Sequence, residues 1–365
     1  MKDIGSIFPL YEAEIKEIEP VSPLCSDHRN HFFSLCREAL SHIAAENGES
    51  YRKVLIPAYT CSTVIIPFVQ QGWECMYYKI GKDLRIQTEE TLEIAKATKP
   101  NIFVAHPFYG MDLTEEEMNM IRTIREMGCK TVVDITQCIF SDQYYNIADY
   151  TIGSYRKWFP IPDGAFMHID SDKGLEMSLY PEHEQFVNIQ VSAMVLRGVY
   201  FQTGNETVKN ISIKLNKMAD SIAETEISEH RISALSYAIY TMQDFKRNAE
   251  QRLRNYKYLY SKLAFMSSVT PVCGDIAYIT VAPLYFPVYV ENRTVLQGAL
   301  ARKKIYAPVL WPVYSDDLLI SDDVSYIYSH ILLIPIDQRY NLNDMERIVE
   351  AFEIIDNEQS CSHRS

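Results

Sequence analysis

Glycine is scarce in this chain, with 13 residues in 365, and no segment is rich in glycine or repeats at a fixed period. This scarcity excludes flexible glycine-rich linkers and repeat architectures. Long apolar runs are also missing: the most apolar segment, 276–290, contains two prolines and is too short to cross a bilayer as a helix. The first residues contain no apolar run of the kind that a signal peptide needs, so we expect a cytoplasmic protein with no membrane partner.

The eight cysteines are scattered, and none forms the C-x-x-C pair that is typical of a zinc or redox site. We therefore expect free thiols in a reducing compartment. Positive charge is in deficit, because 35 Lys and Arg residues stand against 48 Asp and Glu residues, for a formal net charge of −13. That balance argues against nucleic acid as a partner. The hydrophobic share of 47% is ordinary for a globular protein with a large core.

Strand and helix patterns alternate along the first half of the chain. Apolar residues at helical spacing predict a helix over 31–46, and Thr114 with Glu117 forms a capping box that begins another helix. The predicted strands are 53–57, 74–78, 101–106, 130–134, 148–154 and 165–169, and the helices between them are 60–71, 88–97 and 114–127. This alternation predicts an α/β fold, with a three-layer large domain around a mostly parallel sheet.

The second half is mainly helical from about 185 to 263 and then mixes short strands with helices, which predicts a smaller α+β C-terminal domain. Its predicted strands are 276–280, 286–290 and 331–335, and its predicted helices are 293–302 and 343–355. We accordingly divide the chain into an N-terminal arm (1–30), a large domain (31–240), a C-terminal small domain (241–357) and a polar tail (358–365).

Polar residues follow several predicted strands, where open parallel sheets bind their ligands: Tyr59, His106, Asp134, and Ser154 with Lys157. Lys157 precedes two aromatic residues and two prolines, a setting unlike that of a solvated surface lysine. A lysine that forms a Schiff base, together with a strand-end aspartate for the ring nitrogen, is the pair that pyridoxal phosphate (PLP) requires. An aspartate at a strand end also suits a turn, and a lysine beside tryptophan also suits the surface.

Two further features fit the same cofactor. Gln137, three residues after Asp134, is placed to donate a hydrogen bond to the ring hydroxyl oxygen. A helix start near 34–37 offers backbone N–H groups to the phosphate, and Arg37 adds a positive charge. The sequence therefore places a PLP site in the large domain.

Between about 34 and 169 the chain resembles, in family order, the DegT/StrS-type sugar aminotransferases, which are PLP enzymes of fold type I. The matching segments are Cys36-Arg37-Glu38-Ala39-Leu40 at the phosphate loop, Ile56 to Thr63 at a strand–helix joint, Ala105 to Gly110 at a "His-x-x-Gly" strand end, Val133 to Gln137, and Ser154 with Lys157 and Asp163-Gly164. No single segment is specific, and the order and spacing together carry the resemblance.

The resemblance implies a role for each matching residue. Lys157 would be the internal-aldimine lysine and Asp134 the partner of the ring nitrogen, and these two are the expected catalytic residues. The expected cofactor-binding residues are Lys157, Asp134, Gln137, Ser154, Cys36, Arg37, Cys61, Tyr59 and His106, with no metal. The family implies a homodimer that moves an amino group from a donor such as glutamate to an oxo sugar or a similar small oxo substrate.

Three positions depart from the family pattern. Cys36 and Arg37 stand where Gly and Thr are usual, and Cys61 stands at the ring-stacking position, where many members have an aromatic residue. The spacing from Ser154 to Lys157 is three instead of five. These departures keep two alternatives open: lyase or dehydratase chemistry on PLP, and a binding or regulatory protein without catalysis. In the dehydratase relative a histidine replaces the lysine, which this chain retains.

Other motifs compete less well. Ser154-x-x-Lys157 also matches penicillin-recognising acyl enzymes, but the chain contains no Lys-Thr-Gly or Ser-Asp-Asn segment. The segment Arg156-Lys157-Trp158 suits a nucleic-acid contact, which the acidic charge opposes. His28 and His31, beside Cys25, form an H-x-x-H pattern without a clear third metal ligand.

Overall fold

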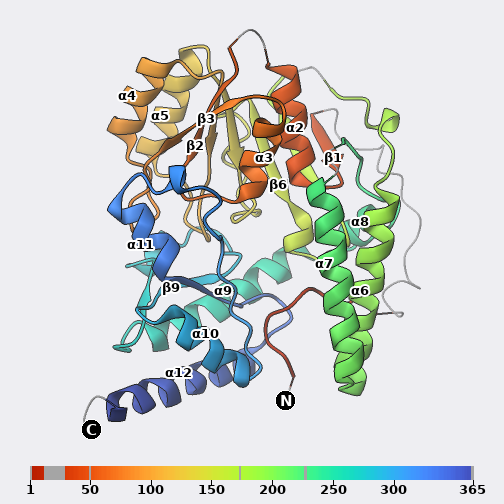
Figure 1. The fold of residues 1–365 in the computed structure, drawn as a ribbon, viewed down its shortest axis with the longest axis vertical. Helices are drawn as coiled ribbons and strands as arrows, with labels where there is room; N and C mark the ends of the chain where they lie inside the picture. Colours follow the sequence, from red (N-terminus) through yellow and green to blue (C-terminus); the bar gives the residue numbers. More distant parts are fainter. Residues whose placement is uncertain (1, 12–28, 49–50, 172–173, 226–227, 363–365) are drawn as a thin grey trace.

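The computed structural model describes residues 2–11, 29–48, 51–171, 174–225 and 228–362, with side chains up to Ile355. Two sheets organise this part of the chain, a large sheet in the upper half of Figure 1 and a small sheet below it. The large sheet contains β1 (Asn30–Phe33), β2 (Lys53–Pro57), β3 (Glu74–Tyr78), β4 (Ile102–Ala105), β5 (Lys130–Asp134), β6 (Tyr150–Ser154) and β7 (Ala165–Ile169).

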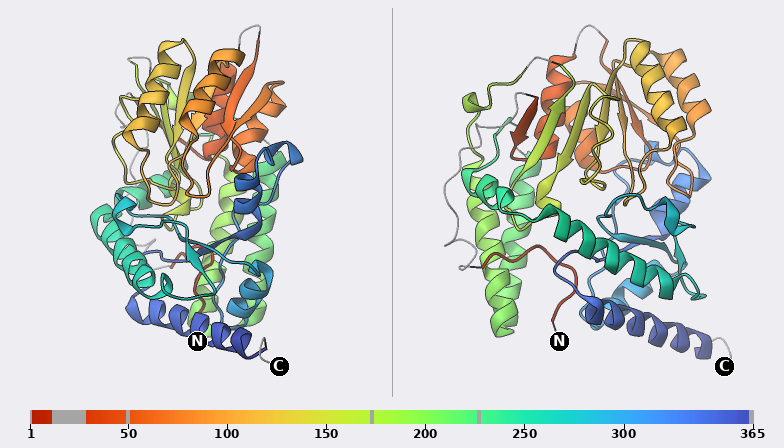
Figure 2. Two further views of the ribbon diagram at one scale, coloured as in Figure 1. Left: turned by 90° about the vertical axis from the view of Figure 1, so that its left-hand side faces the viewer. Right: turned by 180° about the vertical axis from the view of Figure 1, so that it is seen from behind.

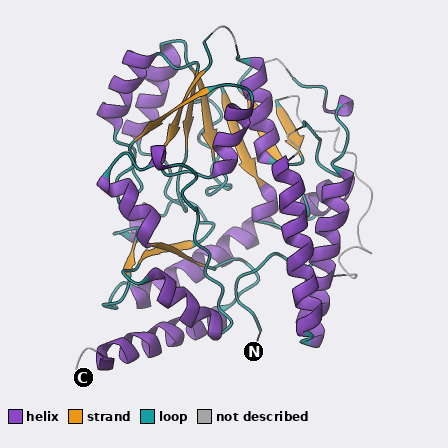
Figure 3. Cartoon of the chain, viewed as in Figure 1, coloured by secondary structure: helices purple, strands orange, loops and turns teal. Residues whose placement is uncertain are grey.

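The seven strands lie in the order β1-β7-β6-β5-β4-β2-β3. From β3 to β6 all neighbours are parallel, and only β7 runs against both of its neighbours. The helices that follow the early strands are α2 (Cys36–Glu46), α3 (Ser62–Gln70), α4 (Thr88–Thr98) and α5 (Glu115–Glu126), and they cover the sheet faces in Figure 3. The predicted α/β fold with a mostly parallel sheet is confirmed.

Local sequence explains these elements. Residues at the centre of β2, such as Val54 and Leu55, are fully buried, because helices cover both faces of the sheet. The predicted capping box of α5 is present: Thr114 Oγ1 accepts a hydrogen bond from the backbone N of Glu117, whose carboxylate accepts one from the backbone N of Thr114. The structure therefore follows the sequence closely from β2 to β7.

Helices dominate the middle of the chain. They are α6 (Glu184–Thr203), α7 (Glu206–Thr225), α8 (Ala234–Thr241) and α9 (Phe245–Leu263). Helices α6 and α7 pack against each other as an antiparallel hairpin, which extends beyond the large sheet in Figure 2. Among the described residues, no helix has the length and apolar character that crossing a bilayer would need.

The second sheet has its own core. Its strands are β8 (Thr270–Pro271), β9 (Phe286–Tyr289) and β10 (Ile331–Ile334), and its helices are α10 (Arg293–Arg302), α11 (Asp322–His330) and α12 (Leu342–Ser362). Ile4, near the N-terminus, packs into this core and exchanges backbone hydrogen bonds with Lys304 and Tyr306. The first residues of the chain therefore lie against the last part, while the division of the chain into four segments remains a prediction.

Three predicted elements were wrong in part. The helix predicted over 31–46 begins only at Cys36, because residues up to Phe33 form strand β1 and pair with β7. The strand predicted over 276–280 is a 3-10 turn over Ile276–Tyr278, which Asp275 caps. The last helix begins at Leu342 and continues past Ile355 to Ser362.

Candidate active site

The carboxyl ends of neighbouring parallel strands bring the predicted polar residues to one edge of the large sheet. Asp134 is the last residue of β5, Ser154 is the last residue of β6, and His106 directly follows β4. Lys157 ends the 3-10 turn Tyr155–Lys157 that follows β6. Because these strands are adjacent, the fold gathers side chains that the sequence separates.

Asp134 and His106 form a buried polar pair. Oδ2 of Asp134 lies 3.8 Å from Nδ1 of His106, and Oδ1 accepts a hydrogen bond of 2.9 Å from the backbone N of Thr136. Nε2 of His106 lies 2.9 Å from Oγ1 of Thr60. Burial lowers the pKa of His106, and the nearby carboxylate only partly offsets this effect, so the imidazole is neutral near pH 7.

The neutral ring leaves Asp134 without a positively charged ion-pair partner among the described residues. A buried carboxylate is costly unless a cation or several hydrogen-bond donors face it. The site can therefore accept a protonated ring nitrogen, which would supply the missing positive charge.

Lys157 is exposed, contrary to the expectation from its aromatic neighbours. Trp158 and Phe159 turn into the core instead, and the indole Nε1 of Trp158 donates a hydrogen bond to the carbonyl of Thr136. Within the described ranges Lys157 makes no hydrogen bond or ion pair, although its charge acts on Cys36 and His106. Its amine is therefore available for covalent chemistry.

The start of α2 forms a positively charged end of the site. Nη1 of Arg37, in the first turn, donates a hydrogen bond of 2.7 Å to the carbonyl of Ala223 on α7. Burial lowers the pKa of Arg37, and the neighbouring guanidinium of Arg156 lowers it further. Two guanidinium groups near a helix N-terminus create a favourable environment for an anion such as a phosphate.

Two other predicted residues have side chains whose state the surroundings define, Cys36 by its protonation and Gln137 by its orientation. Burial and the Asp134 carboxylate raise the pKa of Cys36 well above its usual value, so this residue remains a thiol. The side-chain oxygen of Gln137 accepts a hydrogen bond of 3.2 Å from the backbone N of Tyr109, which fixes the amide.

One cavity of about 30 Å³ brings together seven of the nine residues predicted to bind the cofactor: Cys36, Arg37, Cys61, His106, Asp134, Gln137 and Lys157. Ser154 and Tyr59 do not line it. The backbone N of Ser154 donates to Oγ1 of Thr136, and the hydroxyl of Tyr59 donates to the carbonyl of Leu310 from a fully buried position. Both residues are buried, and each contacts a residue that lines the cavity, Thr136 for Ser154 and Trp311 for Tyr59.

Sequence reasoning missed five lining residues: Leu40, Thr63, Val64, Thr136 and Trp311. Thr136 lies inside the predicted motif between Asp134 and Gln137, so its position was visible. Trp311 comes from the second half of the chain, and no motif marked it. Its ring centroid lies 5.0 Å from that of Tyr59, which supports the cavity wall from behind.

A second cavity of about 980 Å³ lies beside the first. Lys157 is the one described residue that lines both cavities. The larger cavity is bordered by residues from the N-terminal segment, the α6–α7 hairpin and the second half of the chain, including Ser6, Arg156, Gln190, Asn216, Arg252 and Arg339. The small cavity alone holds little more than a water molecule, so a cofactor would need the Lys157 side chain to move and would share the larger space.

The donor set fits PLP in chemical terms. In the described part of the chain, the small cavity is lined by a buried carboxylate with no ion-paired cation, a lysine amine with no hydrogen bond, and a basic helix N-terminus, and each suits one part of the cofactor. The H-x-x-H pattern gains no such support, since Cys25 and His28 lie outside the described residues, and Nε2 of His31 accepts a hydrogen bond from the backbone N of Leu175.

Neither a protein-family model nor a curated protein matches the chain. Solved structures do match it. NtdA from Bacillus subtilis with bound cofactor PMP has a TM-score of 0.66 at 17% identity, covering 90% of this chain and 73% of that one. DesI in the presence of its TDP-sugar product has a TM-score of 0.69 at 11% identity, covering 100% and 96%.

A DegT DnrJ EryC1 StrS aminotransferase from Brucella abortus is also similar, with a TM-score of 0.61 at 14% identity and 94% of each chain covered. The match extends over nearly the whole of both chains. The chain therefore has the fold of these aminotransferases, as its motifs led us to expect.

Proposed function

We propose that the chain is a PLP-dependent aminotransferase of the DegT/StrS type, which moves an amino group from a donor such as glutamate to an oxo sugar or a similar small oxo substrate. The observation that carries the proposal is the convergence of Asp134, Lys157 and Arg37 on one cavity, in a fold shared with aminotransferases. When bound, PLP supplies an electron sink for the carbanion of the substrate.

Lys157 is the central residue of the proposed reaction. Its amine would hold the cofactor covalently and, once released, would act as base and then acid, taking a proton from the Cα of the donor and delivering it to the C4′ atom of the cofactor. Its position between the two cavities suits this role, because the cofactor side and the substrate side are both within its reach.

The other residues hold and tune the cofactor. Asp134 keeps the ring nitrogen protonated, and the neutral His106 packs beside it without competing for the carboxylate charge. Arg37 and the start of α2 bind the phosphate, with Cys36 in the same turn. Gln137 would donate to the ring hydroxyl oxygen, and Cys61 would pack against the ring, since both residues line the small cavity. Ser154 and Tyr59 hold two of the lining residues in place, Thr136 and Trp311 respectively.

The larger cavity is the proposed substrate site. Arg252 is buried, and its guanidinium carbon lies 4.4 Å from the centroid of the Trp158 ring. Its Nη2 has no hydrogen-bond partner among the described residues. Burial lowers its pKa to about 10, so it remains a cation near neutral pH. With Arg156 it offers positive charge to an anionic substrate. A nucleotide-linked sugar, the class named for DesI, has the matching charge.

A homodimer is part of the proposal. The α6–α7 hairpin carries exposed apolar side chains, Val195 and Val199 on α6 and Ile211 and Met218 on α7, and a second copy would cover them. Light scattering on wild type and Val199→Asp tests the dimer, and a monomeric wild type would contradict it.

We propose the cytoplasm as the location of the protein, where the six described cysteines would persist as free thiols.

The visible absorption spectrum with added PLP tests the proposed function. We expect a band that borohydride fixes to the protein in wild type and not in Lys157→Ala, with Lys214→Ala on α7 as the control that behaves as wild type. Bleaching of the band by glutamate favours amino transfer, and its persistence favours lyase chemistry. No band at saturating PLP would overturn the proposal and leave the binding or regulatory role.

A further inference from the structure

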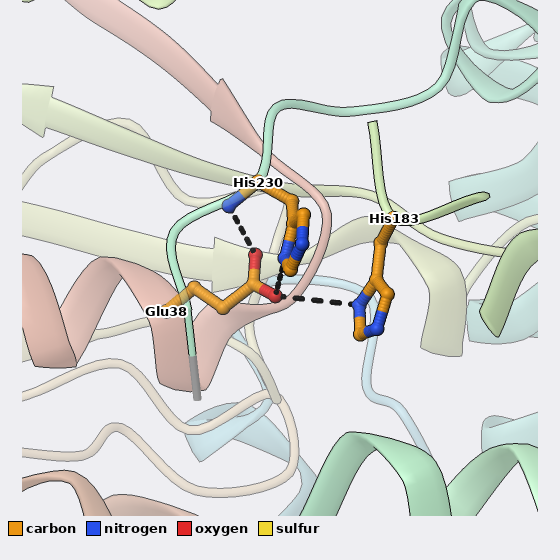
Figure 4. Close-up of side chains that lie close together, drawn as sticks. All are labelled: Glu38, His183 and His230. Carbon is orange, nitrogen blue, oxygen red and sulfur yellow. Dashed lines mark hydrogen bonds and ion pairs between the residues drawn. The ribbon is translucent and has the colours of Figure 1, made fainter. Parts of the chain in front are cut away.

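A second cluster of chemically active side chains lies away from the cofactor cavity. Glu38 is in the first turn of α2, His183 directly precedes α6, and His230 lies between α7 and α8. All three are buried, and Figure 4 shows their polar atoms pointing toward one another. None of them lines either of the two cavities. The proposed reaction has no use for this cluster.

The carboxylate of Glu38 is the centre of the cluster. Its Oε2 accepts hydrogen bonds from the backbone N atoms of Leu35 and His230, each of 3.3 Å. These bonds fix the carboxylate, and Oε1 then faces the two imidazoles, 3.0 Å from Nδ1 of His230 and 3.6 Å from Nδ1 of His183. One carboxylate oxygen is therefore shared by two imidazole nitrogens.

His183 is the unusual member. Its side chain is only 4% exposed, yet neither ring nitrogen has a hydrogen-bond partner in the described part of the chain. A buried polar atom without a partner destabilises the folded protein, and a bound ion is one way in which such an atom gains a partner. The ring stacks on that of His230, with centroids 4.1 Å apart and planes 12° from parallel. A positive ion bound between the rings and the carboxylate would give Nδ1 of His183 the partner that it lacks.

We propose that Glu38, His183 and His230 form a binding site for a divalent transition-metal ion of the zinc type. Imidazole nitrogen and carboxylate oxygen are both zinc ligands, and with bonds of about 2.1 Å a tetrahedral ion holds its ligand atoms about 3.4 Å apart. The measured separations of 3.0 and 3.6 Å lie on either side of that value, and all three ligand atoms lie within 4.8 Å of one another.

Two features support the coordination. The nearly parallel rings point their lone pairs side by side, so one ring must turn to bind the ion, and His183 can turn without losing a hydrogen bond. Nε2 of His230 lies 3.4 Å from Oγ of Ser228, the kind of outer contact that holds the other nitrogen toward a metal. A water molecule would complete the coordination, and one carboxylate leaves the site with a net charge of +1.

The ion would have a structural role. It would tie the start of α2 to the segments before α6 and α8, three parts of the chain that are far apart in the sequence. Glu38 lies in the same helical turn as Cys36 and Arg37. The ion would therefore stabilise the turn that we assign to the phosphate, without taking part in the reaction.

Metal content and thermal stability test the site. The full-length protein is stripped with EDTA, exchanged into chelator-free buffer and titrated with ZnCl₂ by calorimetry, and the bound metal is counted by mass spectrometry. We expect about one zinc per chain and a rise in melting temperature on binding. His183→Gln and Glu38→Gln should lose both, while His42→Gln, which alters a similar His–Glu pair with a 3.0 Å contact to Glu229, should keep both.

Each outcome decides the proposal. His183→Gln removes no side-chain hydrogen bond in the described part of the chain, so it should fold, and circular dichroism of the variant confirms that before the titration. Co²⁺ in place of zinc should give a visible band for tetrahedral nitrogen and oxygen ligands in wild type and not in the variant. Equal zinc binding by wild type and folded His183→Gln would overturn the proposal, and so would a wild type that binds no zinc at micromolar concentration.

Discussion

Oδ2 of Asp134 and Nδ1 of His106 lie 3.8 Å apart at the ends of the adjacent strands β5 and β4. Burial lowers the pKa of His106 and keeps the imidazole neutral, so the ring does not act as a cation toward Asp134. The carboxylate thus retains its full attraction for a cation that enters the cavity. We therefore expect substitution of Asp134 to change how the site binds a positively charged ring.

Asp134→Asn should leave the fold intact and impair chemistry, because the amide has nearly the same shape and no charge. We expect the rate of the half-reaction with glutamate to fall by on the order of 100-fold, the scale of losing one electrostatic contact in a preorganised site. Stopped-flow absorbance of the PLP-loaded protein measures it. Asp142→Asn, at an exposed position after β5, is the control, and a variant as fast as wild type would contradict the assigned role.

His106 should make the stability of the protein depend on pH in a definite direction. Burial lowers its pKa in the folded state, whereas the unfolded chain takes up a proton below about pH 6.5. Its contribution is therefore complete above that pH and is lost as the pH falls below it. The urea midpoint of wild type should drop more between about pH 7.5 and pH 5.5 than that of His106→Gln. Equal drops in both proteins would contradict this account.

The sequence predicted the first sheet well because its evidence is local. Short apolar runs define β2 to β7, helices separate the strands from β2 to β5, and residues at the strand ends converge where the strands are parallel. The same logic explains why seven of the nine residues predicted to bind the cofactor line one cavity. Local patterns do not show which residues at a strand end are exposed to a cavity. Ser154 and Tyr59 lie at the ends of the expected strands, but neither residue lines the small cavity.

Long-range contacts explain the remaining errors. Residues 31–33 are predicted as the start of a helix, because the partner strand β7 is distant in the sequence and so short a strand shows no clear alternation. Trp311 reaches the cavity from the second half of the chain, and His183 and His230 meet Glu38 only in the folded protein. The spacing of residues within a motif does not predict contacts between residues that are far apart in the sequence.

Arg37→Gln should weaken the binding of PLP and leave pyridoxal, which lacks the phosphate, almost unaffected. A hydrogen bond to a charged group contributes about 1.5–3 kcal/mol, so we expect the dissociation constant of PLP to rise about 10- to 100-fold. Fluorescence titration with both ligands measures the difference. Arg122→Gln, on the exposed surface of α5, is the control. An equal loss for both ligands would show that Arg37 acts on the fold and not on the phosphate.

Gly110 holds the loop after β4 against the second half of the chain. Its φ is +85°, and its carbonyl accepts hydrogen bonds from the backbone N atoms of Thr280 and Val281. A Cβ at this position would lie 2.7 Å from the carbonyl oxygen of Val281 and 2.8 Å from a side-chain carbon of Pro283. Alanine here therefore meets both an unfavourable backbone conformation and a steric clash.

Gly128, just past α5, separates the two effects. Its φ of +91° is nearly the same, but no atom lies within 4 Å of the added Cβ. We expect Gly128→Ala to lower the free energy of unfolding by about 1–2 kcal/mol, the backbone cost alone, and Gly110→Ala to lower it by about 2–5 kcal/mol. Urea denaturation measures both values. Equal losses would mean that the 280–283 segment moves aside freely, and the link between the two halves of the chain would then be looser than the contacts of Gly110 indicate.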